Sequence, residues 1–194
     1  MLIALTSAKG APGVTTAALA LALSWPRRVV LAELDPTGGD VLAGYGRGEL
    51  CAGGLAELEL AARRGGPARH LDGHLLQLDG DGRVRLLPGL ADPATARHVD
   101  WHRLAAALAS TDGGATDVLA DCGRLRAEHF PTDIGQRAAV VVLVTGSSLR
   151  AVRAATHAVA GLRAEPAGTG PNAGGLAAVV IGPGSPRRGS AKSR

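Results

Sequence analysis

The sequence predicts an α/β protein with a doubly wound, mainly parallel sheet and helices on both faces. Short apolar runs that suit buried strands alternate along the chain with segments whose apolar residues recur at helical spacing. A length of 194 residues suits one domain with a sizeable core. Hydrophobic residues make up 46% of the chain and aromatic residues only 2%, so we expect an aliphatic core.

The first expected element is a buried strand over the apolar residues 2–5. A helix is expected after Gly13, with alanine and leucine continuing until Pro26 ends it. The run at 28–34 predicts a second strand that stops at Asp35. These elements give the strand–loop–helix–strand order that is typical of parallel sheets.

A short helix is expected near residues 55–64. The apolar segments 74–78 and 83–87 flank a turn of glycine and aspartate, and they could form a hairpin or two successive edge strands. Residues 100–110 then predict a helix. Its apolar face is expected to carry Trp101, Leu104 and Leu108.

The remaining elements continue the alternation. Residues 117–120 predict a short strand, and 138–144 form the most continuous apolar run, which is typical of a central parallel strand covered on both faces. Apolar residues at helical spacing predict a helix over 149–162. A proline- and glycine-rich linker and a last strand at 176–181 complete the expected domain.

The net charge of +4 comes from the end of the chain. Without its last four basic residues the formal charge is 0. We therefore expect a balanced domain over residues 1–182 and a basic, disordered tail over residues 183–194. The basic residues are Arg187, Arg188, Lys192 and Arg194.

The two cysteines, Cys51 and Cys122, lie far apart and form no C-x-x-C pair. This usage predicts a reduced, cytoplasmic protein with neither a zinc site nor a disulfide framework. The opening run lacks a basic region, so we expect a first strand and not a signal peptide. No stretch approaches the about 18 apolar residues of a membrane span, and we expect no membrane insertion.

The segment Lys9–Thr16 lies between the first expected strand and helix, which is a favourable place for an anion. The first-turn N–H groups of a helix have no intrahelical partners, and the helix dipole is positive there. Thr15 is placed to offer its hydroxyl to Mg²⁺, with Thr16 beside it for a phosphate oxygen. The residues expected to contact a nucleotide are Gly10, Ala11, Gly13, Val14, Thr15 and Thr16.

Two aspartates are expected near this loop. Asp35 ends the second expected strand and Asp121 ends the strand expected at 117–120. Ligand sites in open α/β sheets form at the carboxyl ends of strands. The loop, Asp35 and Asp121 could therefore converge on one Mg-nucleotide, although an aspartate taken alone is usually a turn residue or a helix cap.

Over about residues 1–182 the chain resembles the MinD/ParA family of P-loop ATPases. Lys9–Thr16 is similar to the family's deviant Walker A loop, K-G-G-x-G-K-T-T, and the segment 35–39 (DPTGG) resembles its D-P-Q-G-N segment. The resemblance implies ATP and Mg²⁺ as cofactors and a homodimer in which Lys9 acts on the partner's nucleotide. It implies that Asp35 positions the attacking water, and that Asp121, like a Walker B aspartate, holds Mg²⁺ through water.

The chain departs from this pattern as a degenerate, C-terminally short member would. Val14 stands where the P-loop lysine belongs, Ala11 replaces a glycine, and Pro12 lacks a donor N–H. Gly182 stands where the family has an asparagine beside the adenine. Losing one charge-assisted hydrogen bond to phosphate costs about 1.5–3 kcal/mol, or about 10- to 100-fold in affinity. Nucleotide binding could survive, whereas efficient hydrolysis would suffer further.

Three functions follow from this reading. The first is an ATP-dependent dimerising switch in chromosome partitioning or the positioning of cargo, with weak or lost hydrolysis. The second is a pseudo-ATPase adaptor that binds another protein in a secretion, pilus or segregation assembly. The third is weak, non-specific DNA binding through the tail and through Arg150 and Arg153.

Overall fold

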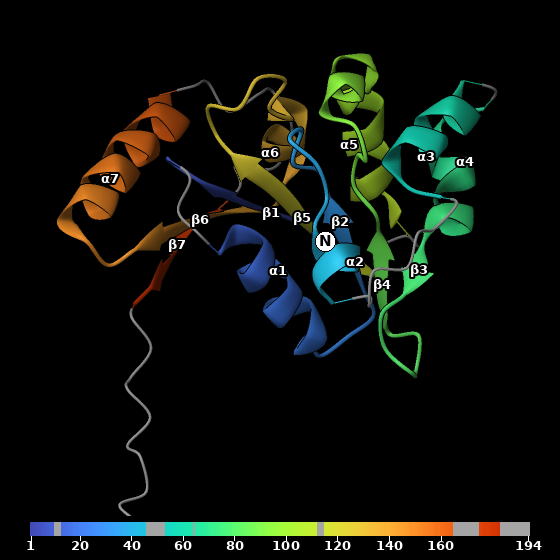
Figure 1. The fold of residues 1–194 in the computed structure, drawn as a ribbon, viewed down its shortest axis with the longest axis horizontal. Coiled ribbons are helices and arrows are strands. Elements are labelled where there is room, and N and C mark those ends of the chain that lie inside the picture. The colour runs from blue at the N-terminus through green and yellow to red at the C-terminus, as the bar shows by residue number, and fades with distance from the viewer. Residues whose placement is uncertain (10–12, 46–52, 64, 112–114, 165–174, 183–194) are drawn as a thin grey trace, which may run out of the picture.

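The computed structural model describes residues 1–9, 13–45, 53–63, 65–111, 115–164 and 175–182 (Figure 1). Its centre is a seven-stranded sheet in the order β3-β4-β2-β5-β1-β6-β7. Every pair of neighbouring strands is parallel except β3 and β4, which are antiparallel. Helices cover both faces, so the predicted doubly wound α/β class is confirmed.

Each predicted strand is present. The two segments at 74–78 and 83–87 form a hairpin in which a two-residue strand pairs with its neighbour. The fourth long strand is longer than predicted because it continues past Asp121 to Arg124. The strands are β1 (Leu2–Ser7), β2 (Val29–Glu33), β3 (Leu76–Gln77), β4 (Val84–Leu87), β5 (Asp117–Arg124), β6 (Val140–Gly146) and β7 (Gly175–Ile181).

The four predicted helices are also present as α1 (Val14–Leu23), α3 (Leu55–Ala62), α5 (Trp101–Ala109) and α7 (Leu149–Ala164). Sequence periodicity did not reveal the shorter elements, because one or two turns are too short to repeat an apolar pattern. These are α2 (Val41–Gly44), α4 (Pro67–His70), α6 (Thr132–Arg137) and two 3₁₀ turns, η1 (Leu71–His74) and η2 (Pro93–His98).

The core forms two layers, one on each face of the sheet. Side chains alternate along β2, so that Val30 enters one layer and Val29 and Leu31 enter the other. The first layer is closed by α3, α5 and α6, and the second by α1. Figure 1 shows α7 on the same face as α5 and α6.

The apolar run at 138–144 was predicted to be a central parallel strand, and β6 does pair in parallel with a strand on each side, β1 and β7. β6 lies next to the edge strand β7, and its first residues, Val140 and Val141, are only partly buried. A continuous apolar run indicates that a strand has little contact with water. It does not reveal how many strands pair beyond it.

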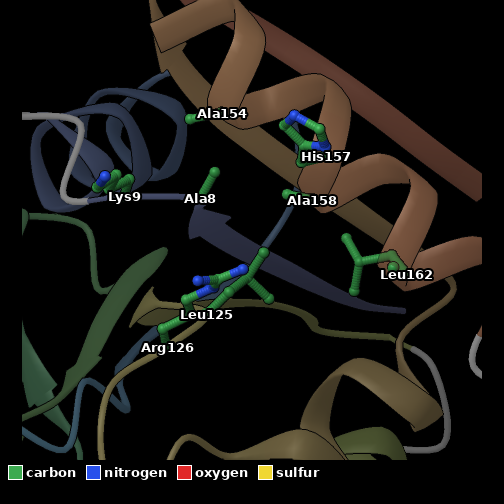
Figure 2. Close-up of a pocket in the computed structure, with 9 residues that line it drawn as sticks. Ala8, Lys9, Leu125, Arg126, Ala154, His157, Ala158 and Leu162 are labelled. Atoms are coloured by element: carbon green, nitrogen blue, oxygen red, sulfur yellow. The ribbon is translucent and has the colours of Figure 1, made fainter. Parts of the chain in front are cut away.

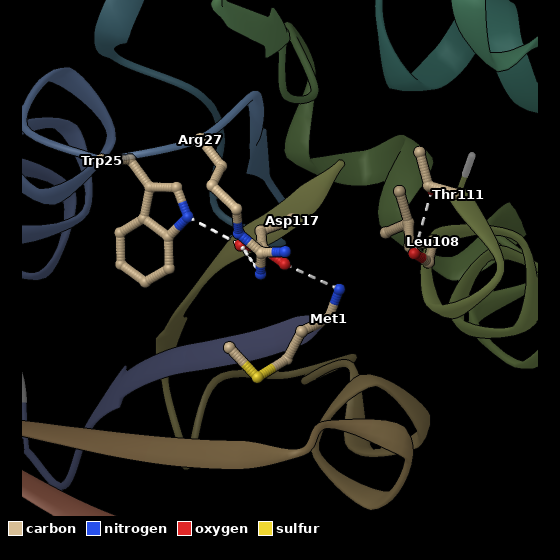
Figure 3. A network of polar contacts seen from close by, with 6 residues as sticks. All are labelled: Met1, Trp25, Arg27, Leu108, Thr111 and Asp117. Carbon is tan, nitrogen blue, oxygen red and sulfur yellow. Dashed lines mark hydrogen bonds and ion pairs between the residues drawn. The ribbon is translucent and has the colours of Figure 1, made fainter. Parts of the chain in front are cut away.

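At the amino ends of the strands, opposite the candidate site, Asp117 joins three segments of the chain (Figure 3). Its carboxylate accepts hydrogen bonds from Arg27 at 2.6 Å, from the Trp25 indole at 2.9 Å and from the Met1 amino group at 2.9 Å. Burial alone would raise the pKa of Asp117, but these hydrogen bonds and positive charges outweigh it and hold the pKa below its usual value. Nearby, the Thr111 hydroxyl caps the end of α5 by donating to the Leu108 carbonyl at 3.0 Å.

Candidate functional site

The loop between β1 and α1 ends at Gly13, whose φ of 111° lies in the left-handed region that favours glycine. A Cβ at this position would meet the Cδ1 atom of Ile181, at the end of β7, at 2.7 Å. The helix that follows has no side-chain cap and no acidic residue in its first turn. Its first N–H groups therefore face the loop as hydrogen-bond donors. Gly10 and Ala11, which were predicted to contact a nucleotide, lie outside the described residues.

The first three residues of α1 differ in burial. Val14 is 6% exposed and belongs to the core layer under α1. Thr15 is half-buried and its side chain hydrogen-bonds to Asp121, whereas Thr16 is exposed. The helix thus directs Thr15 toward the end of β5.

Asp35 follows the end of β2 and Asp121 lies within the adjacent parallel strand β5, and the two side chains lie together as the sequence predicted. Asp35 accepts hydrogen bonds from the Thr37 N–H at 2.8 Å and hydroxyl at 2.7 Å, and Asp121 accepts from the Gly123 N–H at 3.0 Å. Gly123 has a φ of 63°, and a Cβ there would overlap the Asp35 carboxylate. A glycine is therefore required for Asp35 to approach β5 this closely.

Glu33 is an acid near the site that was not among the expected site residues. Its buried carboxylate accepts N–H groups of Asp40 and Val41 at 2.8 Å each and of Gly89 at 3.3 Å. It therefore joins the loop after β2 to the loop after β4. A Cβ on Gly39 would lie 2.9 Å from the Cα of Gly89, so the two loops touch through backbone. An acid in the last position of an otherwise apolar strand was the signal that could have found it.

The site is rich in negative charge. Burial raises the pKa of Asp121, and the charges of Asp35 and Asp40 raise it further, against hydrogen bonds from Thr15 and Gly123. Burial also raises the pKa of Glu33, with a smaller contribution from Asp121 and against its three backbone hydrogen bonds. Asp121, Asp35 and the Thr15 hydroxyl present oxygen atoms, the ligand type that a hard divalent cation prefers. Among the described residues, however, no group of three or more histidine, cysteine, aspartate or glutamate side chains is placed to hold a metal ion.

Lys9 is exposed and borders a cleft of about 640 Å³ (Figure 2). One wall is α7, with His157 and Leu162, and the facing wall is the segment after β5, with Leu125 and Arg126. A smaller adjoining pocket brings Arg150 and Arg153 of α7 beside the same lysine. The charged side chains of the cleft walls are all basic, so it complements an anion.

Two expectations concern features outside this site. Cys122 is buried and its thiol is free, and burial raises its pKa well above the usual value; Cys51 and the tail over 183–194 lie outside the described residues. Among the helices that the structure describes, none combines the length and hydropathy needed to cross a membrane.

The mostly parallel seven-stranded sheet with helices on both faces is a P-loop NTPase-like α/β fold. No protein-family model matches the chain, and no curated protein matches it. Solved structures do resemble it. A ParA family ATPase from Chlorobium tepidum is 17% identical, with a TM-score of 0.66 over 93% of this chain and 72% of that one.

Two further structures share the fold. The septum site-determining protein MinD from Pyrococcus horikoshii, complexed with Mg-ADP, is 21% identical, with a TM-score of 0.65 over 91% of this chain and 67% of that one. Cobyrinic acid a,c-diamide synthase from Mycobacterium smegmatis, with bound ADP and magnesium, is 23% identical, with a TM-score of 0.66 over 93% of this chain and 73% of that one. At these identities the likeness concerns the fold.

Proposed function

We propose that this chain binds Mg-ATP and acts as a MinD/ParA-like dimerising switch in partitioning or in positioning cellular cargo, with weak or lost hydrolysis. The observation that carries the proposal is the convergence of Thr15, Asp121 and Asp35 at the uncapped start of α1. Two of the structural neighbours, a MinD and a synthase, are described with ADP and magnesium, although their overall functions differ. Mg-nucleotide binding is the property these two neighbours share.

The residues present fit an Mg-nucleotide in two respects. The N–H groups in the first turn of α1, which have no side-chain cap, suit a phosphate. The acids beside them repel an anion unless a cation neutralises them. Thr15 would hold Mg²⁺ directly and Asp121 through water, and a bound metal would neutralise phosphate charge. Asp35 would orient water, and Lys9 would reach the nucleotide of a second copy.

The adaptor is the second candidate, and the burial of Val14 favours it. A P-loop lysine would face the phosphates, whereas Val14 contributes to the core under α1. A protein that needs only the fold and a protein partner would tolerate this replacement. DNA binding is the third candidate, supported by the exposed arginines of α7 and by the basic tail.

Calorimetry with Mg-ATP and a phosphate-release assay test the proposal on the wild type, Asp121→Asn, Lys9→Ala and Arg126→Ala. We expect saturable, Mg²⁺-dependent binding that Asp121→Asn weakens at least about tenfold, the effect of one lost charged contact. Any turnover should disappear in Lys9→Ala and persist in Arg126→Ala, which removes another cation from the same cleft.

The outcomes separate the candidates. A folded wild type that binds no nucleotide at millimolar Mg-ATP would contradict the proposal and favour the adaptor. Binding without turnover would support a nucleotide-binding switch and would exclude ATP hydrolysis by this chain. Val14→Lys restores a lysine at the P-loop position and should strengthen nucleotide binding only if the variant folds. Its thermal unfolding must therefore be measured as well, because the new ammonium group has to leave an apolar core before it can reach phosphate. A salt-sensitive gel shift, lost on deleting residues 183–194, tests the DNA candidate.

A further inference from the structure

The two edges of the sheet differ in their protection against pairing with another chain. β3, at one edge, has two residues and is followed by a turn that contains Asp79 and Asp81. β7, at the other edge, has seven residues, GLAAVVI, with no charge and no proline. Natural edge strands are usually short, charged, bulged or covered. Within the described residues, β7 shows none of these devices.

The backbone bonds to β6 determine which groups of β7 face outward. The Gly175 N–H donates to the Ala139 carbonyl at 2.8 Å, and the Ile181 carbonyl accepts from the Ser147 N–H at 3.2 Å. Backbone groups alternate in direction along a strand, so the odd-numbered residues bond to β6. The N–H and C=O groups of the even-numbered residues point away from the sheet: Leu176, Ala178 and Val180.

The side chains beside this edge are apolar and accessible. Val180 is 58% exposed, and Val152 of α7 is 45% exposed. Val152 and Val159 are seven residues apart and therefore share one side of α7. The Lys9 cleft, toward β1, is lined by the other side of the helix, including His157. Since β6 and β7 follow β1 in the sheet, the side with Val152 faces the β7 edge.

We propose that two copies of this chain pair through β7, antiparallel, and form one continuous sheet without requiring a nucleotide. A twofold axis perpendicular to the sheet places Ala178, the middle residue of β7, opposite its own counterpart. The same axis keeps both α7 helices on one face, where their valine sides meet. Each copy thereby supplies the outward hydrogen-bonding groups and the apolar side chains that the other requires.

Charge favours a second copy over an acidic partner at this edge. β7 carries no charge, and Arg150 and Arg153 line the Lys9 pocket, where an acidic partner would bind instead. Arg163 lies on the valine side, but at the last turn of α7. In the antiparallel arrangement the two copies of Arg163 are separated by about 20 Å along the helices, beyond the screening length of about 8 Å.

The size of the surface predicts how strong the dimer is. Seven strand residues and sixteen helix residues each span about 24 Å, so the two elements match in length. A helix packed on a strand presents a side roughly 20 Å high. Multiplied by the length of about 24 Å, this gives a buried surface on the order of 500 Å² for each copy. A standard interface buries about 800 Å² per partner, so we expect a reversible dimer with a dissociation constant of roughly micromolar magnitude.

Sedimentation velocity of the full chain without nucleotide, from roughly 1 to 500 μM, tests the proposal across that range. We expect a concentration-dependent monomer–dimer equilibrium that Val180→Lys weakens at least about tenfold by placing two ammonium groups in the pair. Ile181 is left unchanged because it contacts Gly13. Leu60→Lys is the control, since Leu60 is 66% exposed on α3 and should leave the equilibrium unaltered. A monomer at every concentration, or equal effects of both lysines, overturns the proposal.

Cross-linking tests the register. Directly opposed residues of antiparallel strands have Cβ atoms about 4.5–5.5 Å apart, slightly beyond the roughly 3.5–4.5 Å of a disulfide and within reach of a short thiol-specific cross-linker. Ala178→Cys should therefore give a covalent dimer with a short bifunctional maleimide, above the background of the wild type and of Leu60→Cys. A dimer that does not cross-link at this position refutes the antiparallel pairing. A dimer that forms only with Mg-ATP and disappears in Lys9→Ala belongs to the nucleotide switch and also refutes it.

Discussion

At the scale of single residues, Gly123 controls how closely Asp35 approaches Asp121. Gly123→Ala adds a methyl group that overlaps the Asp35 carboxylate, at a φ of 63° that alanine adopts only with strain. We expect a loss of about 1–3 kcal/mol in unfolding free energy and a loss of Mg-nucleotide binding, since Asp35 must move. Urea unfolding and calorimetry measure the two effects.

Gly135→Ala provides the matched control for this substitution. Gly135 lies in α6, and a Cβ there would meet no atom within 4 Å. Alanine is favoured over glycine inside a helix by up to about 1 kcal/mol, so this variant should be as stable as the wild type or more stable. Equal behaviour of the two variants would show that Gly123 does not position Asp35.

The sequence located these aspartates because a parallel sheet brings the carboxyl ends of its strands to one edge. It did not reveal that Gly123 makes room for Asp35, since that contact joins segments far apart in the chain. Val14 was expected in the nucleotide loop, and its side chain lies in the core. Burial depends on the rotation of α1 over the sheet, which a motif does not specify.

At the scale of elements, Glu33 joins the loops that follow β2 and β4 through three N–H groups. Because its folded-state pKa is raised, the folded protein holds the Glu33 proton more tightly than the unfolded chain does. Its stabilising contribution is therefore complete below the usual pKa of 4.5 and is lost as the pH rises through the raised value. Asp121, whose pKa is also raised, acts in the same direction.

We expect Glu33→Gln to reduce this pH dependence. The glutamine carbonyl can keep the bonds to Asp40 and Val41, which share one carboxylate oxygen, and it cannot gain or lose a proton. From pH 7 to pH 5 the melting temperature of the wild type should rise relative to that of the variant. Calorimetric melts over this range compare the two proteins, and parallel pH profiles would contradict the expectation.

The longer helices could be predicted from the sequence, whereas the shortest ones could not. α1, α5 and α7 span enough turns to repeat an apolar pattern, whereas α2, α4 and α6 have four to six residues. α2 is held at its start by Glu33, a contact across eight residues that no local pattern shows.

At the scale of the whole molecule, stability should fall from the centre of the sheet toward β7. β5 has seven of its eight residues buried, whereas six of the seven residues of β7 are exposed. In hydrogen exchange at a protein concentration well below about 1 μM, under the dissociation constant expected for the dimer, we predict that amides of β7 exchange well before those of β5. Mass spectrometry of peptides from both strands measures this, and equal protection would contradict the gradient.

The sequence by itself determined the α/β class, the order of the long elements and the convergence of Thr15, Asp35 and Asp121, because periodicity and strand ends are local properties. Only the tertiary structure decided that Val14 is core, that Glu33 joins two loops and that β6 lies beside β7 at one edge of the described sheet. Each of these depends on which surfaces meet after the chain has folded. Two segments can carry the same apolar pattern whether a neighbour covers them or water does.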